Sequence, residues 1–229
     1  MQRSTLIVSC TTKKHFQDTL LHQSLVKIQT QLQDAFETKF YCENKTGLSK
    51  IYNAALKEYG KMYQRIVYIH DDVALDDAML DSKLDDAMNN LGYDIVGLAG
   101  ALNPAIKHPA LWHIMSKRED HRGYAGHFAS NGIKFMTGFG STPSRVAIVD
   151  GLFVAVKTKT ALEKNWQWNE NFEFHHYDIA SCIDANFKGM RVGVYPINAF
   201  HQSPGLMSLD DVAWSQSNKK FLQLYSQQP

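Results

Sequence analysis

The feature that most constrains the fold is an unbroken apolar run at residues 66–69, followed at once by His70, Asp71 and Asp72. Such a run is typical of a strand that is covered on both faces, as in α/β proteins. Ligands of open α/β sheets bind at the carboxyl ends of the strands, where these three polar side chains would lie. Two carboxylates beside an imidazole suit a divalent cation that holds a diphosphate, whereas Asp is also common in turns. The run therefore predicts a strand that ends either in a metal-assisted nucleotide site or in a polar turn.

The rest of the sequence alternates between helix-like and strand-like patterns. Apolar residues recur at helical spacing across residues 16–32, 48–59, 80–91 and 179–187, and further strands are expected at residues 5–9, 40–42, 94–100, 146–149, 152–156 and 192–195. Residues 208–225 resemble an amphipathic helix, whereas residues 102–145 break the pattern and are expected to form long loops. The alternation predicts a single α/β domain with a mostly parallel, mixed sheet flanked by helices.

Composition excludes several classes of function. The 24 basic and 23 acidic side chains leave a net charge of +1, so the chain carries no broad footprint for nucleic acid. Cys10, Cys42 and Cys182 lack metal-type spacing and are expected to be buried, reduced thiols. No segment reaches the length that spans a bilayer, and no signal peptide is expected. These features predict a cytoplasmic protein, or one peripheral to a membrane, and they leave the oligomeric state open.

Six segments, taken in order, carry a resemblance to a known family. They are Asn-Lys-Thr-Gly-Leu-Ser-Lys-Ile-Tyr-Asn at 44–53, Tyr-Ile-His-Asp-Asp-Val at 68–73, Gly-Leu-Ala-Gly at 97–100, Val-Asp-Gly at 149–151, Phe-His-His-Tyr-Asp at 174–178 and Phe-His-Gln-Ser at 200–203. Their order and spacing resemble the GT-A-fold nucleotide-sugar glycosyltransferases of the inverting family-two type, in a compact branch with His-x-Asp in place of Asp-x-Asp. The resemblance implies one Rossmann-like domain over residues 1–229. Within it, residues 1–100 would form a nucleotide-binding half, 101–203 an acceptor-binding half, and 204–229 a C-terminal helix.

The same resemblance implies a metal site made by His70, Asp72 and His201, with Asp72 as the main carboxylate ligand. Imidazole ligands favour Mn²⁺, and Mg²⁺ stays open as the alternative. In such enzymes the cation neutralises charge that grows on the donor diphosphate as the sugar departs. A single histidine after a strand is also commonly structural, which is the alternative for His201.

Catalysis by inversion needs a base that takes the proton of the acceptor hydroxyl, and the resemblance implies Asp178 in that role. The alternative is that Asp178 complements the dipole at the start of a helix. The chain departs from the family pattern at Ala180, where a second acid is expected. His175 and His176 do not predict a zinc site, because adjacent side chains project in different directions and no thiolate accompanies them.

The resemblance also implies residues that bind the substrates. Donor-binding residues are expected at the ends of the first strands and at the next helix, namely Ser9, Thr11, Thr12, Glu43, Asn44, Ser49, Asn53 and Asp71. The resemblance places Asp150 and Gly151 near the acceptor or the donor sugar, and the amphipathic ring of Trp112 suits a contact with a sugar ring. Each has a structural alternative: loop hydroxyls bond their own backbone, Ser49 caps a helix, Asn53 bonds a loop, Asp-Gly forms a tight turn, and tryptophans pack in the core.

Together these features predict a metal-dependent glycosyltransferase. It would move a sugar from a nucleotide-sugar, with UDP as the expected nucleotide, to a hydroxyl of a glycan, a lipid-linked sugar or a protein. The alternatives are a metal-dependent phosphoesterase or nucleotidyltransferase that uses the same acidic strand end, and a non-catalytic nucleotide-sugar binding protein. The absence of a Gly-x-x-x-x-Gly-Lys-Ser/Thr segment counts against ordinary nucleoside triphosphatases.

Overall fold

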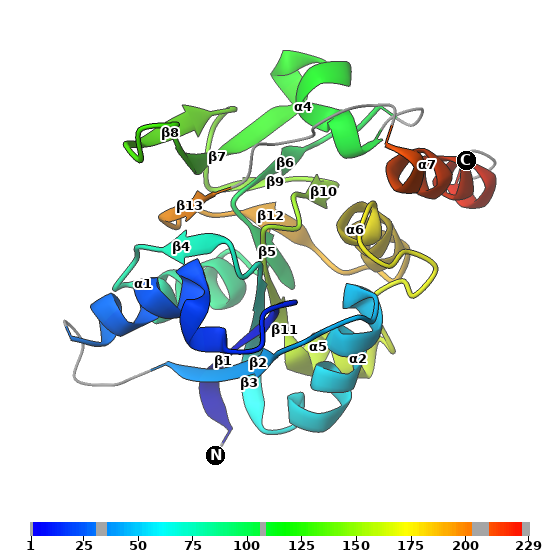
Figure 1. Ribbon diagram of the computed structural model, residues 1–229. Helices are drawn as coiled ribbons and strands as arrows, with labels where there is room; N and C mark the ends of the chain where they lie inside the picture. The colour runs from blue at the N-terminus through cyan, green and yellow to red at the C-terminus, as the bar shows by residue number, and fades with distance from the viewer. Residues whose placement is uncertain (1, 31–35, 106–108, 203–210, 226–229) are drawn as a thin grey trace.

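The computed structural model describes residues 2–30, 36–105, 109–202 and 211–225, and Figure 1 shows strands in the middle with helices on both sides. The strands are β1 (Arg3–Cys10), β2 (Glu37–Tyr41), β3 (Tyr63–Ile69), β4 (Val73–Leu75), β5 (Ile95–Gly97), β6 (Ala99–Ala101), β7 (His121–Phe128), β8 (Lys134–Gly138), β9 (Ser144–Arg145), β10 (Ile148–Val149), β11 (Phe153–Lys157), β12 (Val192–Val194) and β13 (Ala199–His201). The α-helices are α1 (Leu20–Gln29), α2 (Leu48–Tyr59), α3 (Leu80–Asp85), α4 (Trp112–Met115), α5 (Thr158–Glu163), α6 (Tyr177–Phe187) and α7 (Val212–Tyr225). Short 3₁₀ or π turns lie at Phe16–Asp18, Asp86–Asn90, Pro109–Leu111 and Arg118–Asp120.

The main sheet is mixed, as the sequence predicts. Within the described residues its seven strands follow the order β2-β1-β3-β11-β5-β12-β9. Strand β1 runs parallel to both β2 and β3, and β12 runs parallel to β5. Strand β11 lies antiparallel between β3 and β5, so the sheet contains fewer parallel neighbours than the alternation of strands and helices suggests. This insertion brings the turn before β11 to the carboxyl end of β3.

A second sheet continues from the first and includes residues for which the sequence predicts only loops. Its order is β10-β6-β7-β13-β4, with β8 paired to β7. The expectation of loops over residues 102–145 is therefore wrong, because β7 and β8 form an antiparallel hairpin there. Strand β7 reads His-Arg-Gly-Tyr-Ala-Gly-His-Phe, which lacks the β-branched residues that usually signal a strand.

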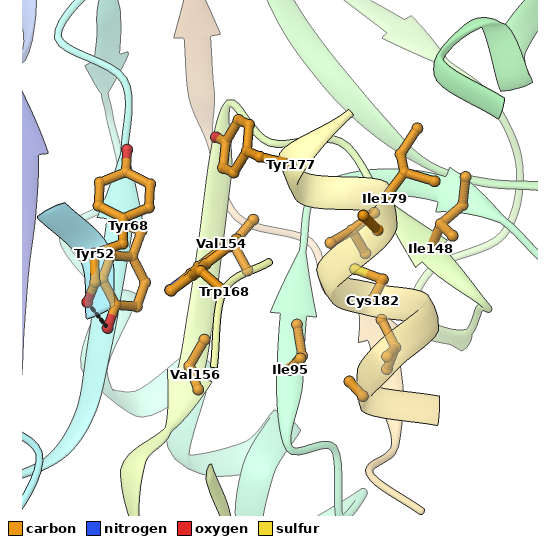
Figure 2. Packing of buried hydrophobic residues seen from close by; sticks show 14 of the residues in the cluster. Tyr52, Tyr68, Ile95, Ile148, Val154, Val156, Trp168, Tyr177, Ile179 and Cys182 are labelled. Carbon is orange, nitrogen blue, oxygen red and sulfur yellow. Dashed lines mark hydrogen bonds between the residues drawn. The ribbon is translucent and has the colours of Figure 1, made fainter. Parts of the chain in front are cut away.

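The core is divided by the sheet into two clusters. One contains residues of α2, α5 and α6, and the other contains residues of α1 and α3, in agreement with the two sides seen in Figure 1. Figure 2 shows part of the first cluster, in which aromatic rings from α2, β3 and the segment before α6 gather beside β11. Full burial of one such side chain contributes about 1.5–3 kcal/mol, so packing on both faces stabilises the sheet.

Most predicted elements are confirmed, with shifts at their ends. The predicted strand at 94–100 divides at Leu98 into β5 and β6, which belong to different sheets. The helix predicted over 16–32 begins only at Leu20, because Thr19 caps it by accepting a hydrogen bond from the backbone N–H of His22. Strand β13, which carries His201, was not expected. Helix α7 confirms the predicted C-terminal helix from Val212 onward, whereas residues 208–210 of that prediction lie outside the described residues.

Candidate metal and base site

The predicted metal-binding residues meet because two short strands pair beside the end of β3. His70 follows β3 directly, and its backbone N–H donates to Leu152 O over 3.1 Å. Strand β13 then pairs antiparallel with β4, so that His201 lies opposite Val73. The N–H of Gln202 donates to Asp72 O over 2.9 Å and closes this arrangement. Residues 130 positions apart in the chain thus share one edge of the fold.

Donor atoms of His70, Asp72 and His201 all lie within 4.8 Å of one another. The Nε2 of His201 is 3.2 Å from Asp72 Oδ1, yet this buried oxygen makes no hydrogen bond of proper geometry to any described residue. A close pair without hydrogen-bond alignment is the arrangement expected when both atoms face a common third point. Two imidazole nitrogens and a carboxylate oxygen also match the ligand preferences of Mn²⁺. The residues present therefore fit a divalent cation.

The electrostatics of the three side chains reflect burial and their mutual contact. Burial lowers the pKa of His70, and the charge of Asp72 opposes this only in part. For His201, burial lowers the pKa, but the contact with Asp72 outweighs it and raises the pKa overall. For Asp72, burial acts to raise the pKa, and the two histidines more than compensate, so the carboxyl pKa is lowered. Asp72 is therefore held in the ionised form that a cation requires.

Two residues at the start of α6 bind the turn between β10 and β11, one at the carbonyl and the other at the N–H of Gly151. Tyr177 donates its hydroxyl proton to Gly151 O over 2.9 Å, and the N–H of Gly151 donates to Asp178 Oδ2 over 2.7 Å. The Tyr177 hydroxyl oxygen also lies 2.9 Å from Nε2 of His70. One residue therefore links the predicted base, the turn and the metal group.

Asp178 is the most perturbed carboxyl group that borders this site. Burial, reinforced by the negative charge of Asp150, raises the pKa of Asp178 to about 7. Hydrogen bonds from the backbone N–H groups of Gly151 and Ile179 fix its orientation and limit the rise. A carboxylate whose pKa lies close to neutrality suits a general base.

A cavity of about 470 Å³ opens onto both groups. Its lining includes His70 and His201 from the metal group, and Asp150 and Asp178 from the acidic pair. The remaining walls are aromatic, aliphatic or histidine residues for the most part, namely Ala99, Ala110, Leu111, Trp112, His113, Ala125, His127, Thr137, Phe139, Gly151, Leu152, Phe174, His175, His176, Tyr177, Ile179 and Trp214. None of these described lining residues is Lys or Arg, so the cavity offers no permanent positive charge of its own.

The predicted donor-binding residues occupy different environments. The hydroxyl of Ser9 is fully buried and has no hydrogen-bond partner among the described residues. Thr11 is buried and its Oγ1 accepts from the N–H of Lys13, whereas Thr12 is exposed. The loops after β1 and β2 are joined, because the N–H of Asn44 donates to Thr11 O over 2.9 Å.

Among the other predicted donor-binding residues, Ser49 and Asn53 use their side-chain polar atoms for contacts within the protein. Ser49 donates to Phe172 O over 2.9 Å, and Asn53 bonds both Trp168 and Glu170. Glu43 adopts a left-handed backbone with φ of 50° in the loop after β2. Asp71 is half-buried, and its carbonyl accepts from the N–H of Leu21. For Asn53 the structure shows the loop contact that was the structural alternative.

Trp112 is 2% exposed and packs with its ring centroid 5.0 Å from that of Phe139, so it forms part of the cavity wall and not an exposed platform. Ala180, where the family pattern leads one to expect an acid, is 0% exposed and lies in the core cluster. Its side chain therefore belongs to the packing of α6, and it is not among the lining residues of the cavity. His176 is buried and its Nδ1 lies 2.9 Å from Ser217 Oγ of α7.

Sequence reasoning assigned no role to Tyr177, although its motif was noted. The only local signal was its place immediately before Asp178. Its contacts with Gly151 and His70 span 26 and 107 positions of the chain, and no periodicity encodes contacts of that kind.

Comparisons with known proteins bear on the family and the fold of this chain. A family model described as "Glycosyltransferase like family" matches residues 6–226. A search of curated proteins found no match. Among solved structures, S. aureus TarS is similar at 11% sequence identity with a TM-score of 0.51, over 98% of this chain and 39% of its own length. This likeness supports an α/β, GT-A-like fold, as the sequence predicts.

Two further structures are similar at TM-scores just below one half. The mannosyltransferase PcManGT from Pyrobaculum calidifontis, solved with GDP-Man and Mn²⁺, is 11% identical over 90% of this chain, with a TM-score of 0.48. S. aureus TarS 1–349 in complex with UDP is 11% identical over 89% of this chain, with a TM-score of 0.49. The chain spans 39%, 58% and 61% of the lengths of the three structures, which is less than two thirds in each case. Of the helices in the described residues, none has the length and apolar character needed to cross a bilayer.

Proposed function

This chain belongs to the glycosyltransferase-like family, and we propose that it transfers a sugar from a nucleotide-sugar, with UDP-sugar as the expected donor, to a hydroxyl acceptor with inversion. The observation that carries the proposal is that His70, His201 and Asp178 border the same cavity, with Asp72 in contact with His201. A cation-binding group and a raised-pKa carboxylate are the two elements that such a transfer needs.

In this proposal His70, Asp72 and His201 hold a divalent cation, with Mn²⁺ favoured and Mg²⁺ as the alternative. The cation supplies Lewis-acid stabilisation of the charge that develops on the donor diphosphate. The cavity lining described above contains no Lys or Arg, so that charge finds no permanent counter-charge in these walls. Metal dependence therefore follows from the composition of the site.

Asp178 takes the proton of the acceptor hydroxyl as that oxygen attacks the sugar carbon. The two backbone N–H groups that bind its oxygens hold it in place without neutralising it. Burial and the nearby Asp150 raise the Asp178 pKa to about 7, which increases its basicity relative to an ordinary carboxylate. Asp150 and Gly151 would lie beside the reacting sugar, and Trp112 would shape the cavity behind it.

In the same proposal, two parts of the chain bind different substrates. Residues 1–100 would hold the nucleotide, at the joined loops after β1 and β2, and residues 101–203 would bind the acceptor within one domain. The acceptor is expected to be uncharged or positively charged near its reacting hydroxyl, because the formal charges in the described cavity lining come from Asp150 and Asp178. A glycan, a lipid-linked sugar or a protein hydroxyl remains compatible with this.

The test is calorimetric binding of UDP, GDP and their sugar conjugates to the purified protein, each with Mn²⁺ and with chelator. Mn²⁺-dependent binding of one nucleotide family is expected, followed by acceptor-dependent release of that nucleotide. Hydrolysis of a phosphate ester without any acceptor would instead support the phosphoesterase. Tight binding of a nucleotide-sugar with no turnover across neutral acceptors would support the non-catalytic binding protein.

A further inference from the structure

The hydroxyl of Tyr177 has only one proton, and its polar neighbours are Gly151 O, Nε2 of His70 and the side chain of Tyr52. Its proton is committed to Gly151 O over 2.9 Å, because a carbonyl oxygen can only accept. The hydroxyl oxygen lies equally close, 2.9 Å, to Nε2 of His70, and it must therefore accept a hydrogen bond from that nitrogen. A neutral imidazole carries one N–H, so a proton on Nε2 leaves the lone pair on Nδ1.

We propose that Tyr177 is a positioning residue that fixes His70 in the Nε2–H tautomer and so makes Nδ1 the atom that binds the cation. The proposal rests on the metal-dependent transfer proposed above. Histidines that bind metals commonly donate their other N–H to a fixed acceptor, which sets both the tautomer and the ring orientation. Here the acceptor is the oxygen of a phenol.

Tyr177 is held too firmly to exchange these roles. It is 2% exposed, and its ring centroid lies 5.5 Å from that of Trp168 and 6.0 Å from that of Tyr52. Figure 2 shows the ring at the first turn of α6, beside the beginning of β11. Turning the hydroxyl proton toward His70 would leave the carbonyl of the buried Gly151 without its donor, which is unfavourable. The packing therefore selects one hydrogen-bond direction.

The same contact ties the metal group to the base. Gly151 accepts from Tyr177 through its carbonyl and donates to Asp178 through its N–H, so two successive residues of α6 bind both ends of one peptide turn. A Cβ on Gly151 would lie 2.6 Å from the Tyr177 hydroxyl and 3.0 Å from Asp178 Cβ, so a side chain there forces both away. Tyr177 thus sets the spacing between the cation and the proton acceptor.

The decisive variant is Tyr177→Phe, which retains the ring and removes only the hydroxyl. Mn²⁺ affinity is measured by calorimetry on the full chain without donor, after thermal unfolding has shown that the variant folds. We expect the affinity to fall about 10-fold or more, as for other outer partners of metal-binding histidines. Tyr124→Phe is the matched control. It also removes one phenol hydroxyl, but this hydroxyl donates to Asn198 over 3.2 Å and does not contact His70. The control is expected to bind Mn²⁺ as the wild type does.

A second measurement reads the tautomer directly and needs no metal. The ¹⁵N resonances of His70, assigned by comparison with His70→Gln, are expected to show protonated Nε2 and unprotonated Nδ1 in the wild type. In Tyr177→Phe both tautomers are expected. If Tyr177→Phe fails to fold, Gly151→Ala, which displaces the hydroxyl, is expected to produce the same mixture of tautomers.

The outcomes separate this proposal from the proposed function. A wild-type Nδ1–H tautomer, or equal Mn²⁺ affinity in the wild type and Tyr177→Phe, would overturn the role of Tyr177 and leave the transferase proposal standing. Failure of the wild type to bind Mn²⁺ would overturn the metal site, whereas the tautomer would still show whether Tyr177 fixes His70.

Discussion

Both ends of β3 carry buried or half-buried ionisable groups, and the two ends differ in how completely those groups are hydrogen-bonded. At the amino end, Arg65 is 2% exposed and donates to Thr5, Ser4, Asp81 and Asp85. At the carboxyl end, the groups are also buried or half-buried, but a carboxylate oxygen lacks a properly aligned partner.

The difference is instructive because burial alone does not distinguish structure from function. A buried charge whose donors all find acceptors holds the fold together, and it has no capacity left for a ligand. The Asp72 oxygen, with His201 close but misaligned, retains its capacity to bind. Variants at the two ends should therefore separate activity from stability.

The largest expected effect on activity is that of Asp72→Ala, at the carboxyl end of β3. Loss of the main carboxylate should remove Mn²⁺-dependent donor binding and reduce turnover by about 10³-fold, the equivalent of several kcal/mol of charge stabilisation. Calorimetry with and without Mn²⁺ measures the first effect, and nucleotide release measures the second. Because this carboxylate supports no well-aligned side-chain hydrogen bond, thermal stability should change little. Metal-dependent donor binding that survives in Asp72→Ala would rule out its role as a ligand.

Asp178→Asn should reduce turnover by about 10²-fold or more, because an amide cannot take the acceptor proton. Donor binding should stay close to that of the wild type, since the cation group is intact. Steady-state kinetics at saturating donor measure the effect, and Asp184→Asn on the outer part of the same helix is the control. Near-normal turnover in a folded Asp178→Asn protein would mean that this carboxylate serves only the start of α6.

The amino end of β3, where Arg65 is fully engaged in hydrogen bonds, is tested by Arg65→Met. This variant approximately keeps the length of the side chain and removes its hydrogen-bond donors. Asp81 and Asp85 are half-exposed, with 43% and 53% of their side chains accessible, so water can compensate for much of the loss. We expect a destabilisation of about 1–3 kcal/mol, measured by urea unfolding. Mn²⁺ affinity of the folded protein should be unchanged.

Arg3→Met provides the control, because both residues of the Arg3–Glu37 pair are exposed and, within the described residues, the only partly buried side-chain hydrogen bond of Arg3 is that to the Tyr63 hydroxyl. It should therefore destabilise the fold less than Arg65→Met does. Equal unfolding midpoints for Arg65→Met and Arg3→Met would contradict the structural role of the buried network. Loss of Mn²⁺ binding in folded Arg65→Met would show that the two ends of β3 are not independent.

The spacing of apolar residues in the sequence predicts most of the helices and strands, and it predicts polar residues at the carboxyl end of β3. The apolar run before His70 and Asp72 predicts a buried strand with polar residues at its end. The structure brings His201 to these residues, and the role of His201 as a metal ligand stays a prediction. Periodicity could not predict β13 or the hairpin of β7 and β8, because short strands rich in Gly, His and Ala carry little alternation. The bond from Tyr177 to Gly151 depends on tertiary packing, which a local pattern does not contain.

The smallest expected effect concerns pH. Burial and, secondarily, Asp150 raise the Asp178 pKa to about 7. A base acts only when ionised, so kcat/KM should be low below pH 7 and rise to a plateau above it. Asp150→Asn removes the repelling charge and should lower the Asp178 pKa, which moves this rise to lower pH. The shift should be partial, because burial is the larger cause and remains.

The measurement is the pH dependence of kcat/KM for the wild type, Asp150→Asn and Asp150→Glu with the same donor and acceptor. Asp150→Glu keeps the charge and should leave the rise near pH 7 even if its turnover is lower. A rise that stays in place in Asp150→Asn would show that the carboxyls are not coupled, and a rise that moves to higher pH would contradict the sign of the interaction. A profile without any rise near neutrality in the wild type would place the proton acceptor elsewhere than at the start of α6.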